Sequence, residues 1–132
     1  MSVSQIILLV PAALLVWYFV RRYMMVRSIN QYTPAEAAAK MKNSLNIVFL
    51  DVRSKQERKT GSIKGSIHLP LHEMKFKIKE LEKYKGKEII CYCGSGNRSL
   101  AAASILKKKG FSSASLRGGI GGWNLYTSQI RG

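Results

Sequence analysis

The segment "IICYCGSGNRSLAAA" (residues 89–103) joins a strand-like run, a polar loop and a helix-like run without interruption. The run "KEIICYC" (87–93) is short and apolar, which is typical of a buried strand. After the loop, "SLAAASILKKKG" (99–110) predicts a helix with lysines in its last turn and Gly110 as its C-cap. Such a unit is typical of parallel sheets, in which ligands bind beyond the carboxyl ends of the strands.

The chain from residue 33 onward alternates strand and helix signals in the same way. Thr33, Pro34 and Glu36 occupy the N-cap, first-turn and capping-box positions of a predicted helix. The other predicted elements are a strand at 46–51, a capping-box helix at 54–57, a strand at 66–68, a helix at 71–84, a strand at 113–116, and a loop at 118–123 leading into a final helical turn. This order predicts an α/β fold with a mostly parallel sheet and helices on both faces.

The first twenty residues differ from the rest because they contain no charged side chain. A helix from Val3 to Val20 would extend roughly 27 Å, close to the hydrocarbon thickness of a bilayer. We therefore expect 1–27 to be a transmembrane anchor, with an apolar span of about 3–20 and a basic juxtamembrane stretch, and 28–132 to be the folded domain. A buried core helix is one alternative. A cleaved signal peptide is the other, but neither a basic n-region nor a small-x-small site is present.

Basic residues follow the apolar span directly, at Arg21, Arg22 and Arg27. Such an excess of positive charge favours the cytoplasmic side of a membrane. We expect a single-pass protein of the bacterial inner-membrane type, with its N-terminus outside, its domain in the cytoplasm and the lipid bilayer as a partner of its N-terminal helix.

Composition narrows the partners further. The chain has 22 Lys and Arg against 7 Asp and Glu, a formal charge of +15. This charge favours anionic partners, but the basic residues are not interleaved with aromatic ones, so we expect no nucleic-acid binding. Lys107, Lys108 and Lys109 are interpreted either as a solvated helix end or as a group attracted to anionic headgroups beside the anchor. Two cysteines spaced C-x-C do not form a disulfide framework, which favours a reducing compartment.

The loop after Cys93 has the composition of an anion-binding site. Gly94 and Gly96 allow the backbone to curl so that successive N–H groups point inward, and the following helix directs its positive end to the same place. Arg98 adds a positive charge, and a thiol in that setting has a lowered pKa and suits nucleophilic catalysis. From these residues alone, a glycine-rich turn with a solvated arginine is an equally good interpretation.

Three separated segments resemble the rhodanese-like domain family. "CGSGNRS" resembles its Cys-x-x-Gly-x-Arg-Ser active-site loop. "DVRSKQERKTGSIKGSIHLP" is similar to its Asp-Val-Arg…Glu…Gly-x-Ile-x-Gly-Ser…Pro signature, and "LRGGIGGW" to its Leu-x-Gly-Gly-x-x-x-Trp. The resemblance covers residues from about 30 to 125. It implies a rhodanese-type α/β fold with five strands and sulfurtransferase chemistry through a cysteine persulfide, with no other cofactor.

The resemblance also implies roles for particular residues. Cys93 matches the cysteine that carries the persulfide, and Arg98 matches the loop arginine. Asp51 and Arg53 match the family's Asp-Val-Arg as supporting residues, for which a structural ion pair is the alternative. The N–H groups that would hold the outer sulfur belong to Gly94, Ser95, Gly96, Asn97, Arg98 and Ser99.

Loop length separates sulfur from phosphate among such domains. The resemblance implies a longer Cys-x5-Arg loop for members that act on phosphate or arsenate, whereas Cys93 to Arg98 is Cys-x4-Arg. A phosphatase or arsenate reductase is therefore a minor alternative. Many thiosulfate-using members carry Arg or Lys where this chain has Gly94, and histidine is common in the family where this chain has Ser62. These departures leave thiosulfate, mercaptopyruvate and persulfides as donors, and thiols, protein cysteines and cyanide as acceptors. They also motivate a second hypothesis, a membrane-tethered binding module with little turnover.

Other reactive side chains are interpreted as structural. Cys91 points to the same side of its strand as Cys93, and burial is the common fate of a free cysteine. A role as a resolving or second sulfur-carrying thiol is its alternative. His68 and His72 do not have the spacing of zinc ligands, nor does C-x-C. We therefore expect no metal.

Overall fold

The computed structural model describes residues 1–43 and 46–131. It contains a five-stranded sheet in the order β1-β5-β4-β2-β3, and the neighbouring strands pair in parallel. The strands are β1 (Asn30–Tyr32), β2 (Ile47–Asp51), β3 (Ile67–His68), β4 (Glu88–Tyr92) and β5 (Ser112–Leu116). The predicted α/β class is therefore correct, and the short β1 is a strand that its composition did not reveal.

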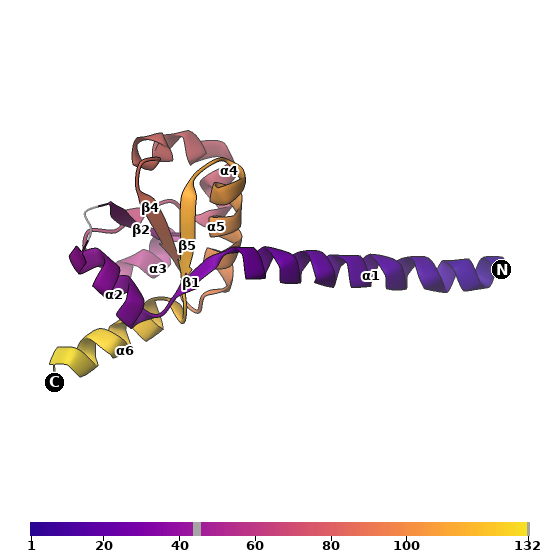
Figure 1. Cartoon of the computed structure of the whole chain (residues 1–132), viewed down its shortest axis with the longest axis horizontal. Helices are drawn as coiled ribbons and strands as arrows, with labels where there is room; N and C mark the ends of the chain where they lie inside the picture. The colour runs from indigo at the N-terminus through magenta and orange to yellow at the C-terminus, as the bar shows by residue number, and fades with distance from the viewer. Residues whose placement is uncertain (44–45, 132) are drawn as a thin grey trace.

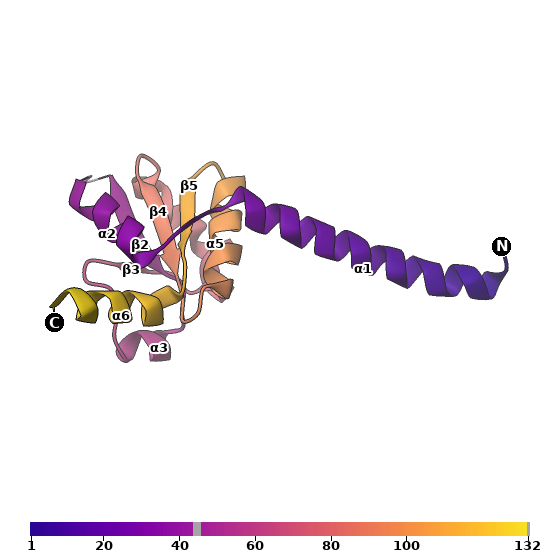
Figure 2. The same ribbon diagram turned by 60° about the horizontal axis from the view of Figure 1, so that its bottom comes forward.

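Helices cover both faces of the sheet, as the alternation predicted (Figures 1 and 2). The α-helices of the domain are α2 (Pro34–Asn43), α3 (Lys55–Lys59), α4 (Met74–Lys77), α5 (Asn97–Lys108) and α6 (Gly119–Arg131), and the 3-10 helices are η1 (Leu71–Glu73) and η2 (Ile78–Tyr84). One core lies under α4, η2 and α5, around Met74 and Leu106. The other lies under α2 and α6, where Phe49 packs against Trp123 with ring centroids 5.3 Å apart.

Capping chemistry explains where two of these helices begin. The Thr33 hydroxyl accepts the backbone N–H of Glu36 ahead of α2. The Ser54 hydroxyl accepts the N–H of Glu57, whose carboxylate accepts the Ser54 N–H, so the predicted capping box starts α3. A glycine marks the C-terminal end of a third helix, α5. Gly110 has a positive φ of 88° and donates its N–H to the Lys107 carbonyl. Gly110 therefore closes that helix as predicted.

Three predicted elements were wrong in form. The single helix expected over 71–84 is instead divided into the three short segments η1, α4 and η2. The stretch 118–123, expected to be a loop before one helical turn, already belongs to the 13-residue α6 from Gly119 on. The helix expected from Ser99 begins at Asn97, so Asn97 and Arg98 lie in its first turn.

The N-terminal helix α1 (Val3–Ser28) stands away from the domain as one rod (Figure 1). It is 26 residues long, and an 18-residue apolar window within it has a mean hydropathy of 2.2 with no part buried. Helices of this length and composition can cross a membrane, and Pro11 within it is tolerated there. The helix continues through the predicted basic juxtamembrane stretch and leads almost directly into β1.

Candidate active site

Cys93 lies directly after β4, at the carboxyl edge of the sheet, and its side chain is buried. Its carbonyl accepts the N–H of Ile120 at 2.9 Å, and the carbonyl of the preceding Tyr92 accepts the N–H of Val52 at 3.1 Å. Hydrogen bonds to both neighbouring segments therefore hold the end of β4. The thiol is thus placed at a fixed point of the sheet edge rather than on a free loop.

The loop after Cys93 curls back over its sulfur. Gly96 takes a positive φ of 111° and serves as the N-cap of α5, a conformation that L side chains rarely adopt. Its N–H donates to the Cys93 Sγ at 2.9 Å. The first turn of α5 follows at once, so the positive end of the helix lies beside the sulfur. The loop therefore curls around the sulfur as the glycine spacing predicted, and its binding of an anion stays a prediction.

The electrostatics of the site favour a thiolate. Burial by itself raises the pKa of Cys93, but hydrogen bonds from Ser99, Gly96 and Ser95 favour the charged form, so the net pKa is lowered. Most of these donors are backbone N–H groups, and Ser99 adds its hydroxyl. The sulfur therefore sits among donors that are already oriented toward a negative charge.

A pair of buried hydroxyls supports the sulfur from below. The Ser99 Oγ lies 3.7 Å from the Cys93 Sγ, donates to the Gly96 carbonyl at 2.9 Å, and lies 2.7 Å from the Ser115 Oγ. A hydroxyl can rotate its single proton between such partners. Ser115 comes from β5 and was not among the predicted site residues, because nothing in "SASL" distinguishes it from an ordinary strand serine.

Arg98 does not donate to the sulfur but to a carboxylate across the loop. Its guanidinium binds Glu57 in a bidentate pair, with N–O distances of 2.6 and 2.7 Å. This pairing lowers the pKa of Glu57 from its ordinary 4.5 to about 2. The sequence predicts Glu57 as part of the capping box at 54–57 and matches it to the Glu of the family signature, without a partner in the loop. The two residues are 41 positions apart, so no local pattern could reveal their contact.

Gly94 lies next to this pair. A Cβ at Gly94 would lie 3.5 Å from a terminal nitrogen of Arg98 and 4.0 Å from the Glu57 carboxylate, which are ordinary contact distances. A Cβ could therefore stand at this position in ordinary van der Waals contact with the pair. The glycine leaves the approach to Cys93 without a side chain.

Asp51 and Arg53 form a buried network next to the loop. Arg53 donates to both Asp51 oxygens through its side chain, at 3.0 and 2.9 Å, and through its backbone N–H. Arg58 adds a third cationic contact to Asp51 at 3.1 Å. Burial raises the pKa of Asp51, but these bonds outweigh it and lower the pKa overall. Arg53 also donates to the Gly61 carbonyl, so the network links β2 to the segment after α3. This geometry is that of a structural ion pair, the alternative given above to a supporting role in catalysis.

The backbone of Gly119 forms the floor of the loop. A Cβ at this position would lie 2.3 Å from the Cys93 carbonyl oxygen and 2.5 Å from that of Gly94, too close for any side chain. Gly119 also has a positive φ of 61°. The glycine pair in "LRGGIGGW" therefore allows the start of α6 to pack directly against the loop. The sequence did not predict this role, because glycines at 118–123 indicated only a loop.

The remaining reactive candidates lie outside this arrangement. Cys91 is fully buried in the core, and burial together with the nearby Cys93 raises its pKa, so it stays protonated. His68 binds the Arg53 carbonyl through its ring at 2.7 Å. Within 1–43 and 46–131, no three residues among His, Cys, Asp and Glu gather as a metal site would require. The expectation of a metal-free site stays a prediction.

The comparison with family models identifies the family. Residues 33–126 match the model of the rhodanese-like domain. The chain belongs to the rhodanese-like domain family. This match includes β2 to β5, the Cys93 loop and most of α6, whereas α1 lies outside it.

Two curated proteins of different name are similar to this chain. A sulfurtransferase of Allochromatium vinosum is 27% identical over 96 residues, which cover 72% of this chain and 88% of that protein. A tRNA uridine(34) hydroxylase of Cytophaga hutchinsonii is 37% identical over 98 residues, 71% of this chain. The match spans only 31% of the hydroxylase, so the likeness concerns less than a third of that protein.

Solved structures give the same result. A rhodanese-related protein from Thermoplasma volcanium is 33% identical, with a TM-score of 0.67, over 74% of this chain and 92% of that one. The five-stranded rhodanese-like fold implied by the sequence resemblance is therefore confirmed.

Proposed function

We propose that this rhodanese-like domain is a sulfurtransferase that carries sulfane sulfur as a persulfide on Cys93. The observation that carries the proposal is the position of the Cys93 Sγ, buried and facing the N–H of Gly96 at 2.9 Å and the first turn of α5. A sulfurtransferase name among the relatives supports the reaction class.

The reaction would proceed by two exchanges at sulfur. The Cys93 thiolate attacks the transferable sulfur of a donor such as thiosulfate, mercaptopyruvate or a polysulfide, and a new S–S bond to Cys93 forms. The bond that breaks is S–S in thiosulfate and polysulfide and C–S in mercaptopyruvate. The electron pair leaves with sulfite, with a shorter polysulfide, or with the enolate of pyruvate, which then takes up the thiol proton. A thiolate of a protein or small molecule, or cyanide, then attacks the outer sulfur and regenerates the Cys93 thiolate.

The surrounding residues would stabilise the anionic states. As the sulfur becomes charged, the Ser99 hydroxyl can turn its proton toward it, while the N–H groups of the loop are already oriented. Arg98, held by Glu57, contributes its charge from a distance. Because Cys93 is buried, a donor reaches the sulfur only when the loop shifts, and Gly94 and Gly96 permit that movement.

The direct test is the intact mass of the full chain after incubation with thiosulfate, mercaptopyruvate and polysulfide in turn. We expect a gain of one sulfur atom with at least one donor, lost in Cys93→Ser and kept in Cys91→Ser. The matched cysteine variants separate the reactive thiol from the packed one. A chain that gains no sulfur from any of these donors would contradict the proposal.

A second function is favoured by one observation, the complete burial of Cys93. The domain would then act as a membrane-tethered binding module with little turnover. Capture of a partner that survives Cys93→Ala would support this function, whereas capture that depends on a loaded persulfide would support the transferase. A phosphatase or arsenate reductase is disfavoured, because the loop from Cys93 to Arg98 is one residue shorter than the Cys-x5-Arg loop that the resemblance implies for such members.

We further propose that α1 anchors the domain in a membrane of the bacterial inner-membrane type. Residues 28–132 would then lie on the cytoplasmic side of that membrane. The apolar, unburied helix and the arginines that follow residue 20 support this placement.

A further inference from the structure

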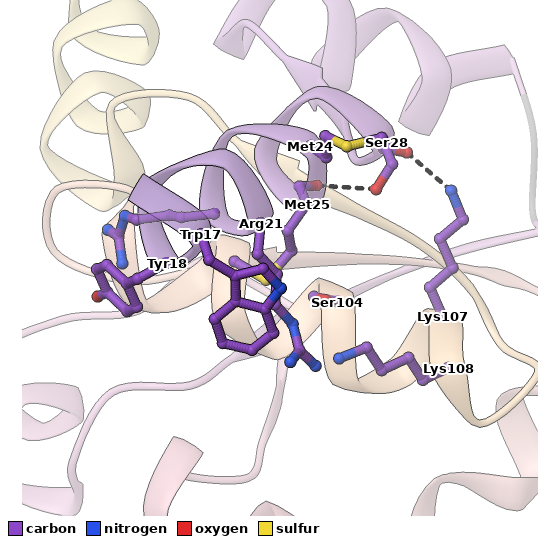
Figure 3. Close-up of a pocket in the computed structure, with 10 residues that line it drawn as sticks. Trp17, Tyr18, Arg21, Met24, Met25, Ser28, Ser104, Lys107 and Lys108 are labelled. Carbon is purple, nitrogen blue, oxygen red and sulfur yellow. Dashed lines mark hydrogen bonds between the residues drawn. The ribbon is translucent and has the colours of Figure 1, made fainter. Parts of the chain in front are cut away.

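A groove of about 660 Å³ lies where the end of α1 meets the end of α5, remote from the Cys93 loop. Its walls come from both helices and combine aromatic, thioether and basic side chains (Figure 3). The lining residues are Trp17, Tyr18, Arg21, Arg22, Met24, Met25, Ser28, Ser104, Lys107 and Lys108. A space of this size is typical of a pocket for a small organic ligand or headgroup.

The charges of the groove are all of one sign. Four of its lining residues are Arg or Lys, and none is Asp or Glu. None of the ion pairs found in the described part of the chain involves any of the four. Arg21 and Lys108 reach toward the same space from opposite helices (Figure 3). Like charges that converge in this way repel one another unless an anion lies between them.

One lysine of the groove already has a structural role. The Lys107 ammonium donates to the Ser28 carbonyl at 2.8 Å and so joins the carboxyl ends of the two helices. The negative ends of both helix dipoles favour cations here. Lys107 therefore fixes the groove's shape, and Arg21, Arg22 and Lys108 remain to bind an anion.

The apolar side of the groove indicates the source of that anion. Trp17 and Tyr18 lie at the end of the uncharged segment, one turn before Arg21, where aromatic side chains mark the interface of a bilayer. The Arg21 guanidinium lies over the Trp17 ring, 5.2 Å from its centroid. At that depth the abundant anions are lipid phosphates, and basic juxtamembrane residues attract them.

We propose that this groove binds the headgroup phosphate of an anionic phospholipid and so seats the domain on the membrane surface. The inference rests on the proposed insertion of α1 into a bilayer but not on sulfur transfer. The lipid phosphate lies between Arg21 and Lys108, and its glycerol and upper acyl chain lie against Trp17 on the bilayer side of the groove.

The test uses the full chain in nanodiscs of phosphatidylcholine with a minority of phosphatidylglycerol, followed by native mass spectrometry of the released protein. We expect phosphatidylglycerol to be retained in preference to phosphatidylcholine. The double variant Arg21→Gln/Lys108→Gln should lower that retention by about tenfold or more, because each cation near the surface contributes to the attraction. The double variant Arg27→Gln/Lys109→Gln removes the same charge from neighbouring positions outside the groove and should retain the lipid.

Four outcomes would overturn the proposal. Equal losses in the two double variants would show general attraction rather than a site, and equal retention of both lipids would exclude selectivity for anionic headgroups. Displacement of the lipid by inorganic phosphate or RNA would assign the groove to another anion. Failure of the chain to enter nanodiscs would refute the anchor itself. Sulfur loading of Cys93, measured in parallel, reports the proposed function separately and verifies that both variants are folded.

Discussion

The lowered pKa of Cys93 comes from neighbouring hydrogen-bond donors that already point toward the sulfur when the thiol is neutral. The thiol is buried, yet backbone donors from the start of α5 and the Ser99 hydroxyl compensate for that burial. Preoriented donors of this kind stabilise an anion without the reorganisation that water would require. The lowered pKa of Cys93 therefore comes from hydrogen bonds that the loop's geometry provides, from Ser99, Gly96 and Ser95.

The Ser99→Ala substitution tests this dependence. Because Ser99 favours the charged sulfur, its loss should raise the pKa of Cys93, and alkylation at neutral pH should slow by about an order of magnitude. In the wild-type chain, alkylation of Cys93 should reach its plateau below the ordinary thiol pKa of 9.0. Iodoacetamide labelling followed across pH by mass spectrometry measures both.

Ser104→Ala is the control, because Ser104 is also buried on α5 but lies away from the sulfur. An unchanged pH midpoint in Ser99→Ala would mean that the backbone donors act alone.

The Arg98–Glu57 pair should make a small, pH-dependent contribution to stability. The pKa of Glu57 is lowered from 4.5 to about 2, so the contribution is present above pH 4.5 and lost as the pH falls toward 2. Since the side chains of Arg98 and Glu57 are 42% and 38% exposed, the pair is worth ~1 kcal/mol or less.

We expect Glu57→Gln to lower the unfolding free energy by that amount at pH 7, with the difference from wild type shrinking as the pH falls through this window. Urea unfolding of the full chain in a neutral detergent measures it. Glu82→Gln, in an exposed pair with Lys85, is the matched control. A difference that stays constant with pH would contradict this account.

At the scale of elements, the contact between α6 and the Cys93 loop leaves no room for a side chain at Gly119. Gly119→Ala would place a Cβ 2.3 Å from the Cys93 carbonyl oxygen, on a backbone with a positive φ. We expect a loss of about 2–4 kcal/mol in unfolding free energy and impaired sulfur loading, because the loop must move.

Gly121→Ala, two residues along α6, is the control for this substitution. Its Cβ would lie 3.9 Å from the Gly94 carbonyl oxygen, and alanine favours a helix by up to ~1 kcal/mol over glycine. This variant should be unaffected or slightly more stable. Comparable losses in both would show that the close approach at Gly119 is not the cause.

Features that depend on residues close together in the sequence could be predicted, whereas features that depend on contacts between distant segments could not. The caps at Thr33 and Ser54 and the apolar strands β2 and β4 are local patterns, and the prediction placed them within a residue or two. The loop was located because strand, glycines and helix are contiguous there. In contrast, β1 has three residues and becomes a strand only by pairing with β5.

The site residues that were missed share that long range. The Glu57–Arg98 and Ser99–Ser115 contacts join different elements, and the role of Gly119 depends on a backbone brought in from residue 93. Composition also misled at 118–123, where glycines suggested a loop although they serve a close helix contact.

At the scale of the whole molecule, the orientation of the anchor is open to direct test. Three arginines follow the apolar span, so we expect the domain on the cytoplasmic side. Protease added to intact spheroplasts should spare the domain, whereas protease added to inverted membrane vesicles should digest it. Digestion in spheroplasts would reverse the topology, and the reaction partners would then have to be periplasmic.

The junction between rod and domain consists of one residue. Ile29 alone separates Ser28, the end of α1, from Asn30, the start of β1, and it is buried in the core. A flexible linker of ten residues would let a tethered domain roam over about 16–19 Å, whereas this junction gives it almost no reach. With α1 embedded, the Cys93 loop would stay at a nearly constant distance from the bilayer surface. A thiol acceptor would then have to place its sulfur at that same distance from the membrane.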